Sequence, residues 1–121
     1  EIDIKFSCEA YTGPYEGKVR DGFFFCRAGI NIASVLIDGS ISACPNINRN
    51  FSQGSIYHDD FQSVWEKRFQ IMRNRNWMKT GICVDCKEFK HCKGGAMHLW
   101  DENKKWIIHC IYKSMQNEIL T

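Results

Sequence analysis

Residues 81–95 read Gly-Ile-Cys-Val-Asp-Cys-Lys-Glu-Phe-Lys-His-Cys-Lys-Gly-Gly, so three cysteines fall within ten residues. Cys83 and Cys86 form a C-x2-C pair, a spacing that lets two thiolates approach one metal ion or cluster. Cys92 follows after five residues and offers a third sulfur. Gly94–Gly95 gives the chain freedom to turn sharply beside that sulfur. The stretch therefore predicts a metal centre around which the rest of the chain is organised.

A site of this kind needs a fourth ligand, and Cys110 is the nearest cysteine downstream. Four thiolates suit tetrahedral zinc as well as an iron-sulfur cluster, and spacing alone does not separate the two. Disulfides are a third alternative, although the seven cysteines of the chain are an odd number that pairing cannot exhaust. The predicted ligand set is Cys83, Cys86, Cys92 and Cys110.

Length and composition limit the possible domain count, binding partners and cellular location. A chain of 121 residues that is 44% apolar fits a single domain with a modest core. The formal net charge of +2 is too small, and the basic residues too dispersed, to indicate nucleic-acid binding. No apolar run approaches the length of a membrane span and no signal-peptide core is present, which favours a cytoplasmic protein. The chain begins at Glu1 without an initiator Met, so we expect an excised domain.

Periodicity predicts a small α+β fold. Asp38-Gly39 between two β-rich runs predicts a β-hairpin at about 32–44, with both residues of a two-residue turn at positive φ. An amphipathic helix of about 14 residues should begin near Asp59 or Asp60 as N-cap, and a final helix should cover roughly 107–120. Residues 45–55 are expected to form a loop.

The remaining cysteines extend the pattern beyond the loop. Cys26 is followed by twelve residues and Gly39, then by four residues and Cys44, which precede the Cys83, Cys86, Cys92 and Cys110 set. This order resembles the SPASM domain, the C-terminal auxiliary iron-sulfur module of many radical S-adenosylmethionine enzymes that modify peptides and proteins. The resemblance implies 4Fe-4S ligation, with zinc as a substitute, and favours iron over zinc at the predicted site. It also implies that residues 1–22 are a linker from an upstream radical S-adenosylmethionine barrel and that residues 23–121 are the auxiliary domain.

One position departs from the family. Ala96 stands where the family has a cysteine of its first auxiliary cluster, whose other ligands here would be Cys26, Cys44 and an upstream cysteine, for which Cys8 is the candidate. Three outcomes are open for this first site. His98 supplies the missing ligand, one iron keeps an open position, or no cluster binds. The second auxiliary site, on the predicted ligand set, is complete.

The resemblance also implies what the domain can and cannot do by itself. The C-x3-C-x2-C motif that holds the cluster cleaving S-adenosylmethionine is absent from the 121 residues, so the domain should be inactive alone. Its expected role is electron transfer, and substrate positioning as a second role, within a peptide or protein maturase whose barrel binds S-adenosylmethionine. The competing hypothesis is a zinc-stabilised interaction module without redox work.

Overall fold

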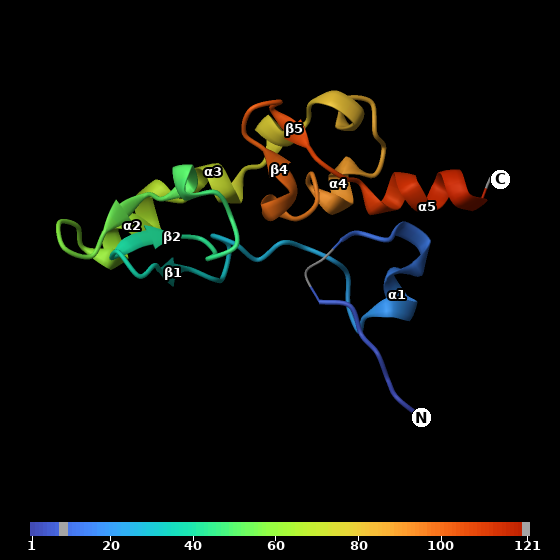
Figure 1. Cartoon of the computed structure of the whole chain (residues 1–121), viewed down its shortest axis with the longest axis horizontal. Helices are drawn as coiled ribbons and strands as arrows, with labels where there is room; N and C mark the ends of the chain where they lie inside the picture. Colours follow the sequence, from blue (N-terminus) through green and yellow to red (C-terminus); the bar gives the residue numbers. More distant parts are fainter. Residues whose placement is uncertain (8–9, 120–121) are drawn as a thin grey trace. The chain divides into compact units, whose positions relative to one another are not determined.

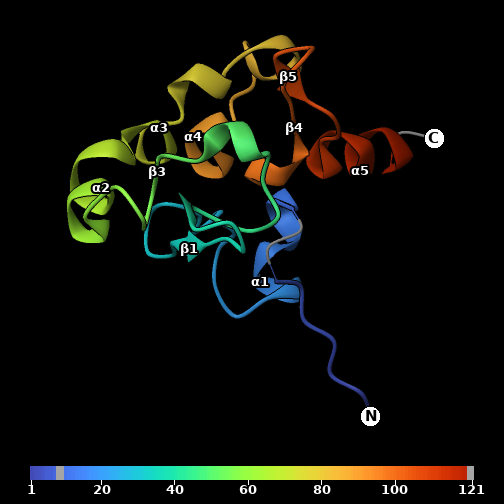
Figure 2. The same ribbon diagram turned by 60° about the vertical axis from the view of Figure 1, so that its left-hand side comes forward.

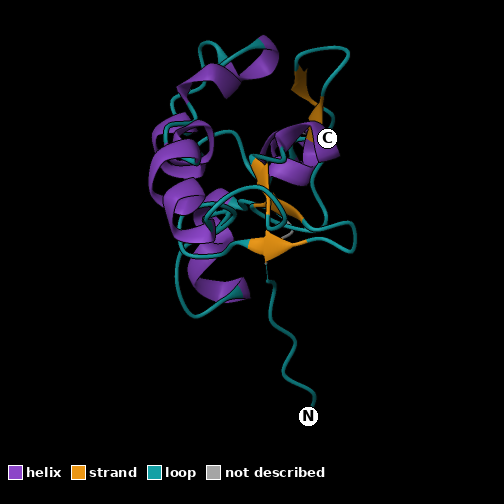
Figure 3. Cartoon of the chain, turned by 90° about the vertical axis from the view of Figure 1, so that its left-hand side faces the viewer, coloured by secondary structure: helices purple, strands orange, loops and turns teal. Residues whose placement is uncertain are grey.

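A computed structural model describes residues 1–7 and 10–119. The chain divides into two compact units, one made of Glu1–Cys26 and Met78–Thr121 and the other of Arg27–Trp77. Both combine short helices with a small antiparallel sheet, so the predicted α+β class is confirmed (Figure 3). No helix of the described part of the chain has the length and apolar character needed to cross a membrane.

The Arg27–Trp77 unit contains the predicted β-hairpin (Figure 1). Strands β1 (Ser34–Val35) and β2 (Ser40–Ser42) pair antiparallel, with Ser34 opposite Ser42. A third strand, β3 (Gly54–Ser55), pairs with β2 on its other side. Residues 45–55 were expected to be loop throughout, and that expectation is wrong at β3, where two residues are too few to show an alternating pattern.

The hairpin turn differs from the predicted two-residue type. The N–H of Gly39 donates to the carbonyl of Leu36, and the N–H of Leu36 donates to Ser40, which closes a three-residue loop. Gly39 has φ +86, whereas Asp38 is not among the residues at positive φ. The Asp38 carboxylate instead accepts from the backbone N–H of Ser40 at 3.0 Å, and this bond stabilises the alternative turn.

The predicted helix begins where its cap indicates. Helix α2 (Phe61–Arg68) starts after Asp60, whose carboxylate accepts from the N–H of Ser63 at 2.9 Å. The helix does not run on for 14 residues, because Phe69 departs from helical geometry and a separate turn, α3 (Gln70–Arg73), follows. Phe69 is fully buried, so packing of its ring decides the local backbone where propensity alone would continue the helix.

The Arg27–Trp77 unit has a hydrophobic core of its own. Arg75, itself 5% exposed, stabilises it by donating to the carbonyls of Met72 and Ala28 at 2.7 Å each. Gly29, at φ +73, passes so close to Met72 that a side chain there would collide with it. The buried apolar residues of this unit are Ala28, Ile41, Ala43, Ile47, Phe51, Val64, Phe69 and Met72.

The unit formed by the two ends of the chain carries the cysteine loop. Its helices are α1 (Glu16–Val19), α4 (Phe89–Cys92) and α5 (Ile111–Ile119). Figure 2 shows α1 near the start of α5. Strands β4 (Trp100–Asp101) and β5 (Trp106–Ile107) form a hairpin that replaces the start of the predicted last helix. Ile107 is 7% exposed and pairs with Trp100, so the helix begins only at Ile111.

Residues 10–26 are packed into this unit. Glu16 is 1% exposed and forms an ion pair of 2.8 Å with Arg20, which is also buried. Phe24 is 3% exposed, whereas its neighbour Phe23 is 78% exposed. The sequence-based boundary, with residues 1–22 as a linker and 23–121 as the domain, stays a prediction.

Candidate metal centre

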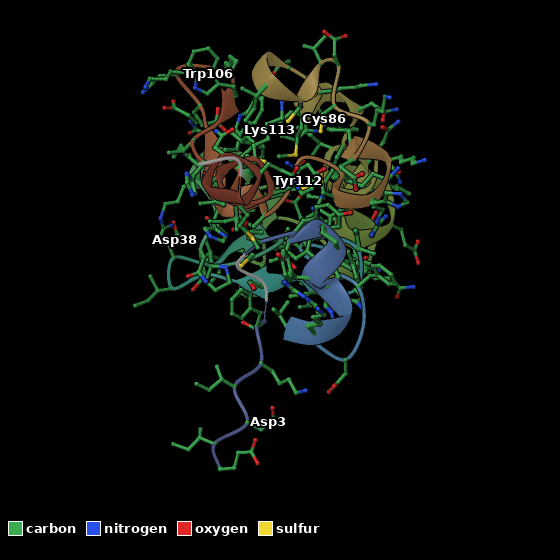
Figure 4. The ribbon with its side chains drawn as sticks, turned by 90° about the vertical axis from the view of Figure 1, so that its right-hand side faces the viewer. Asp3, Asp38, Cys86, Trp106, Tyr112 and Lys113 are labelled. Carbon is green, nitrogen blue, oxygen red and sulfur yellow. The ribbon has the colours of Figure 1, made fainter. Side chains whose placement is uncertain are left out.

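The four cysteines of the predicted ligand set line one pocket. Cys83 ends the 3-10 turn Gly81–Cys83, Cys92 ends α4, and Cys110 immediately precedes α5, where its carbonyl accepts from the N–H of Ser114. The pocket holds about 480 Å³ of space, including the solvent at its mouth. Figure 4 shows Cys86 of the loop together with Tyr112 and Lys113 of α5. The sequence therefore brings four sulfurs to one hollow. The pocket cysteines are Cys83, Cys86, Cys92 and Cys110.

Consecutive turns aim these side chains into the pocket. The N–H of Cys86 donates to the carbonyl of Cys83 at 3.2 Å, and the N–H of Phe89 donates to the carbonyl of Cys86 at 3.2 Å. Phe89 is 5% exposed and anchors the loop between its cysteines. After Cys92 the chain reverses through Lys93, at φ +53, and two glycines. The predicted sharp turn at Gly94–Gly95 is thus present.

The two glycines of this turn differ in what surrounds them. Gly94 has φ +92 and Gly95 has φ +80, values that strain any other residue by about 1–2 kcal/mol. A Cβ on Gly94 would lie 3.0 Å from the Cβ of buried Met78, whereas one on Gly95 would meet nothing within 4 Å. We expect Gly94→Ala to lower the thermal unfolding midpoint more than Gly95→Ala, because only the former adds overpacking, which costs about 1–3 kcal/mol. Equal midpoints in identically prepared variants would contradict the packing described at Gly94.

Burial and mutual repulsion act on the pocket thiols. Desolvation, followed by the charges of Cys92, Cys110 and Cys86, raises the pKa of Cys83 to about 11. Desolvation also raises the pKa of Cys92, and backbone N–H donation from Gly94 opposes it. Both thiols therefore keep their protons at neutral pH unless a cation binds them. Metal binding at this pocket is coupled to proton release.

The donor set of four thiols can hold a single zinc ion or an iron-sulfur cluster. A single zinc draws its thiolates to about 2.3 Å from one point, whereas an iron-sulfur cluster places its four cysteines around a larger body. The six described cysteines are free thiols, which weighs against a disulfide framework. Four thiols around one pocket fit an iron-sulfur cluster.

Three of the candidate ligands of a first auxiliary site, Cys26, Cys44 and His98, are among the described residues. Cys26 packs, half-buried, against an apolar cluster that includes Ala96, which is 1% exposed. His98 is exposed, whereas its neighbour Met97 is buried. Cys44 belongs to the Arg27–Trp77 unit. Cys8 lies outside the described residues.

Sequence reasoning missed several residues that line the same pocket. Lys113 donates from its Nζ to the carbonyl of Ile82 at 2.6 Å and so links α5 to the cysteine loop. Glu88 lies within the loop and Tyr112 lies two residues after Cys110, so proximity to ligands could have indicated both. Tyr11 is remote in sequence from every pocket cysteine and carries no comparable indication.

Comparison with known proteins independently supports an iron-sulfur site in this chain. Residues 26–87 match the SPASM family, described as an iron-sulfur cluster-binding domain. The curated protein named mycofactocin maturase MftC from Mycolicibacterium smegmatis is 33% identical over 78 residues, which are 63% of this chain and 20% of that protein. The protein of the same name from Mycobacterium tuberculosis (strain H37Rv) is 31% identical over 78 residues, with the same shares of the two chains. The match thus spans about a fifth of the length of these relatives. No solved structure matches significantly.

The family match begins at Cys26 and ends one residue after Cys86. It therefore includes the C-x2-C pair, while Cys92 and Cys110 lie beyond it and are placed in the pocket by the fold. Because the match covers half of the chain, and because four thiols share one pocket, the chain belongs to the SPASM family of iron-sulfur cluster-binding domains.

Proposed function

We propose that this chain is the auxiliary domain of a radical S-adenosylmethionine enzyme that modifies a peptide or protein, and that it holds one 4Fe-4S cluster. The observation that carries the proposal is the pocket lined by four cysteines from separate turns. The proposed ligands are Cys83, Cys86, Cys92 and Cys110. When bound, the cluster supplies one-electron redox chemistry.

The chain's own groups would tune that chemistry. Burial of Cys83, which is 5% exposed, keeps water from one side of the pocket. Hydrogen bonding from the backbone of Gly94 opposes the rise in the pKa of Cys92, and such donors stabilise the thiolate and raise a cluster's potential. All four positions are thiols, so no iron is left open for substrate, which favours electron transfer over direct substrate binding.

We base the proposal of a single cluster on Ala96, which stands where the family has a cysteine. Cys26 packs against a cluster that contains Ala96, so an apolar side chain holds the position of the missing ligand. The exposed His98 does not compensate. Of the three outcomes for the first site, we therefore favour the one in which no cluster binds.

The role in the parent enzyme rests on resemblance. The two relatives are named as maturases, and this chain corresponds to about a fifth of each. We propose that the barrel that binds and cleaves S-adenosylmethionine lies elsewhere in the parent protein. The cluster would pass one electron between a peptide or protein substrate and that barrel. We place this enzyme in the cytoplasm, whose reducing conditions keep thiols available for iron.

The proposal is tested by iron, sulfide and zinc content after anaerobic reconstitution of the chain. We expect about four irons and about four sulfides per chain. About eight irons would contradict the single-cluster proposal and restore the first site. One zinc with neither iron nor sulfide would instead support the zinc-stabilised module.

A further inference from the structure

The wall of the cysteine pocket includes residues from outside the cysteine loop and α5. Ala10 and Tyr11 line the pocket together with the four cysteines. Both residues precede the segment that matches the family, which begins at Cys26. The N-terminal part of the chain thus contributes directly to the candidate metal centre.

Tyr11 contacts both segments that supply the sulfurs. Its hydroxyl donates to Glu88 Oε2 at 2.5 Å, and Glu88 lies between Cys86 and Cys92. Its ring lies 5.8 Å from the ring of Tyr112, which follows Cys110 by two residues. With 9% of its surface exposed, Tyr11 is nearly enclosed by these partners. One side chain therefore bridges the loop and the start of α5.

A buried polar network holds the backbone around Tyr11. Glu16 accepts from the N–H of Thr12 at 2.7 Å and from the N–H of Phe24 at 2.9 Å. Arg20 pairs with Glu16 and donates to the carbonyl of Ala10 at 2.5 Å. The residues on both sides of Tyr11 are thus fixed by hydrogen bonds to buried charges, which are stronger than neutral ones.

Close packing fixes the segment from the other side. Gly13 has φ +62, and a Cβ there would lie 2.6 Å from the ring of Tyr112. The chain can pass this close to α5 only because the residue is glycine. Tyr11 and Tyr112 are therefore held against each other by the path of the backbone as well as by their rings.

We infer that Tyr11 is a positioning residue of the metal centre. It closes the pocket toward solvent and holds the loop and α5 at the separation that the bound group requires. This inference rests on the proposed function, since it concerns the same pocket. Partners that orient or shield metal ligands commonly change metal affinity by about 10- to 100-fold when they are removed. Removing the Tyr11 ring should therefore open the centre without removing a ligand.

The test follows cluster loss from reconstituted holoprotein. An iron chelator is added anaerobically, and the decay of visible absorption is recorded for wild type, Tyr11→Ala, Tyr11→Phe and Tyr15→Ala. We expect decay about 10- to 100-fold faster in Tyr11→Ala, with an intermediate rate in Tyr11→Phe, which keeps the ring but loses the bond to Glu88. Tyr15, in the same segment but not part of the pocket wall, is the matched control and should leave the rate unchanged.

A second measurement separates shielding from general stability. Admitting water should raise the midpoint potential of the cluster in Tyr11→Ala, because solvent stabilises the more negative reduced state. A merely structural role would not move the potential of the clusters that remain bound. Should Tyr11→Ala fail to fold, Tyr11→Leu, which removes the ring but keeps a larger apolar side chain, provides the same two measurements.

The outcomes distinguish the inference from the function beneath it. A wild-type chain without iron and sulfide would overturn both. A wild-type chain with about four irons, and Tyr11 variants that match it in decay rate and potential, would overturn the role of Tyr11 and leave the proposed function standing. Equal acceleration by Tyr15→Ala would also overturn the role, because it would show a general effect of the segment.

Discussion

Replacing Cys86 by Ala should lower the iron content of the reconstituted protein from about four per chain to less than one. Cys86 is half-buried in the turn between Cys83 and α4, and it lines the pocket with the other three cysteines. Loss of one thiolate leaves three ligands and exposes one iron to solvent, and we expect release of that iron to destabilise the remaining core, so that the whole cluster is lost. Iron and sulfide analysis after anaerobic reconstitution measures this effect directly.

Two other cysteines provide matched controls for this substitution. Cys44→Ala removes a half-buried thiol of the Arg27–Trp77 unit, and Cys26→Ala removes one from the apolar cluster around Ala96. Both variants should keep about four irons, although Cys26→Ala should lower stability because it leaves a cavity. If Cys86→Ala kept full iron content, the proposed ligand set would be wrong.

Removing the metal should unfold one of the two units and spare the other. The unit that carries the pocket has short helices and a hairpin whose strands have two residues each. Its cysteine loop is held mainly by the hydrogen bonds of consecutive turns. Binding to the folded state alone adds its free energy to folding, so stripping the metal withdraws that stabilisation. Hydrogen exchange should show that amides in residues 78–119 lose protection when the metal is removed. This loss should be larger than the loss that the single substitutions described above cause in the metal-bound protein.

The Arg27–Trp77 unit is the internal control for this experiment. Its core around Ile41, Phe69 and Met72 is fully buried and contains no pocket cysteine. Amides of Ile41 and Met72 should therefore keep their protection after metal removal. Equal loss of protection in both units would contradict the division of the chain into separately stabilised parts.

Local chemistry made part of this structure predictable. Asp60 and Ser63 identify the start of α2, because a side-chain cap satisfies a donor that the helix leaves free. Asp38-Gly39 identified the hairpin, although not its turn, because Gly39 alone takes positive φ. Three pocket cysteines, Cys83, Cys86 and Cys92, were predicted from their spacing, and Cys110 was added as the nearest cysteine downstream.

Other features depend on packing between residues distant in sequence. The break in the helix at Phe69 and the β4–β5 hairpin both follow from burial of one residue, which no local pattern records. Tyr11 reaches the metal centre through Glu88 and Tyr112, contacts that exist only after folding. The same holds for Cys26, which packs together with Cys92 against a cluster that contains Tyr11, Phe24 and Ala96.

The position of Cys110 immediately before α5 bears on biosynthesis. A growing polypeptide releases Cys83, Cys86 and Cys92 from the ribosome well before Cys110, since domains emerge from the N-terminus onward. Stable cofactor insertion must then wait until the last of the four has emerged. A product cut short between Cys92 and Cys110 would retain three sulfurs and a poorly retained cofactor, which would mark it for proteolytic removal.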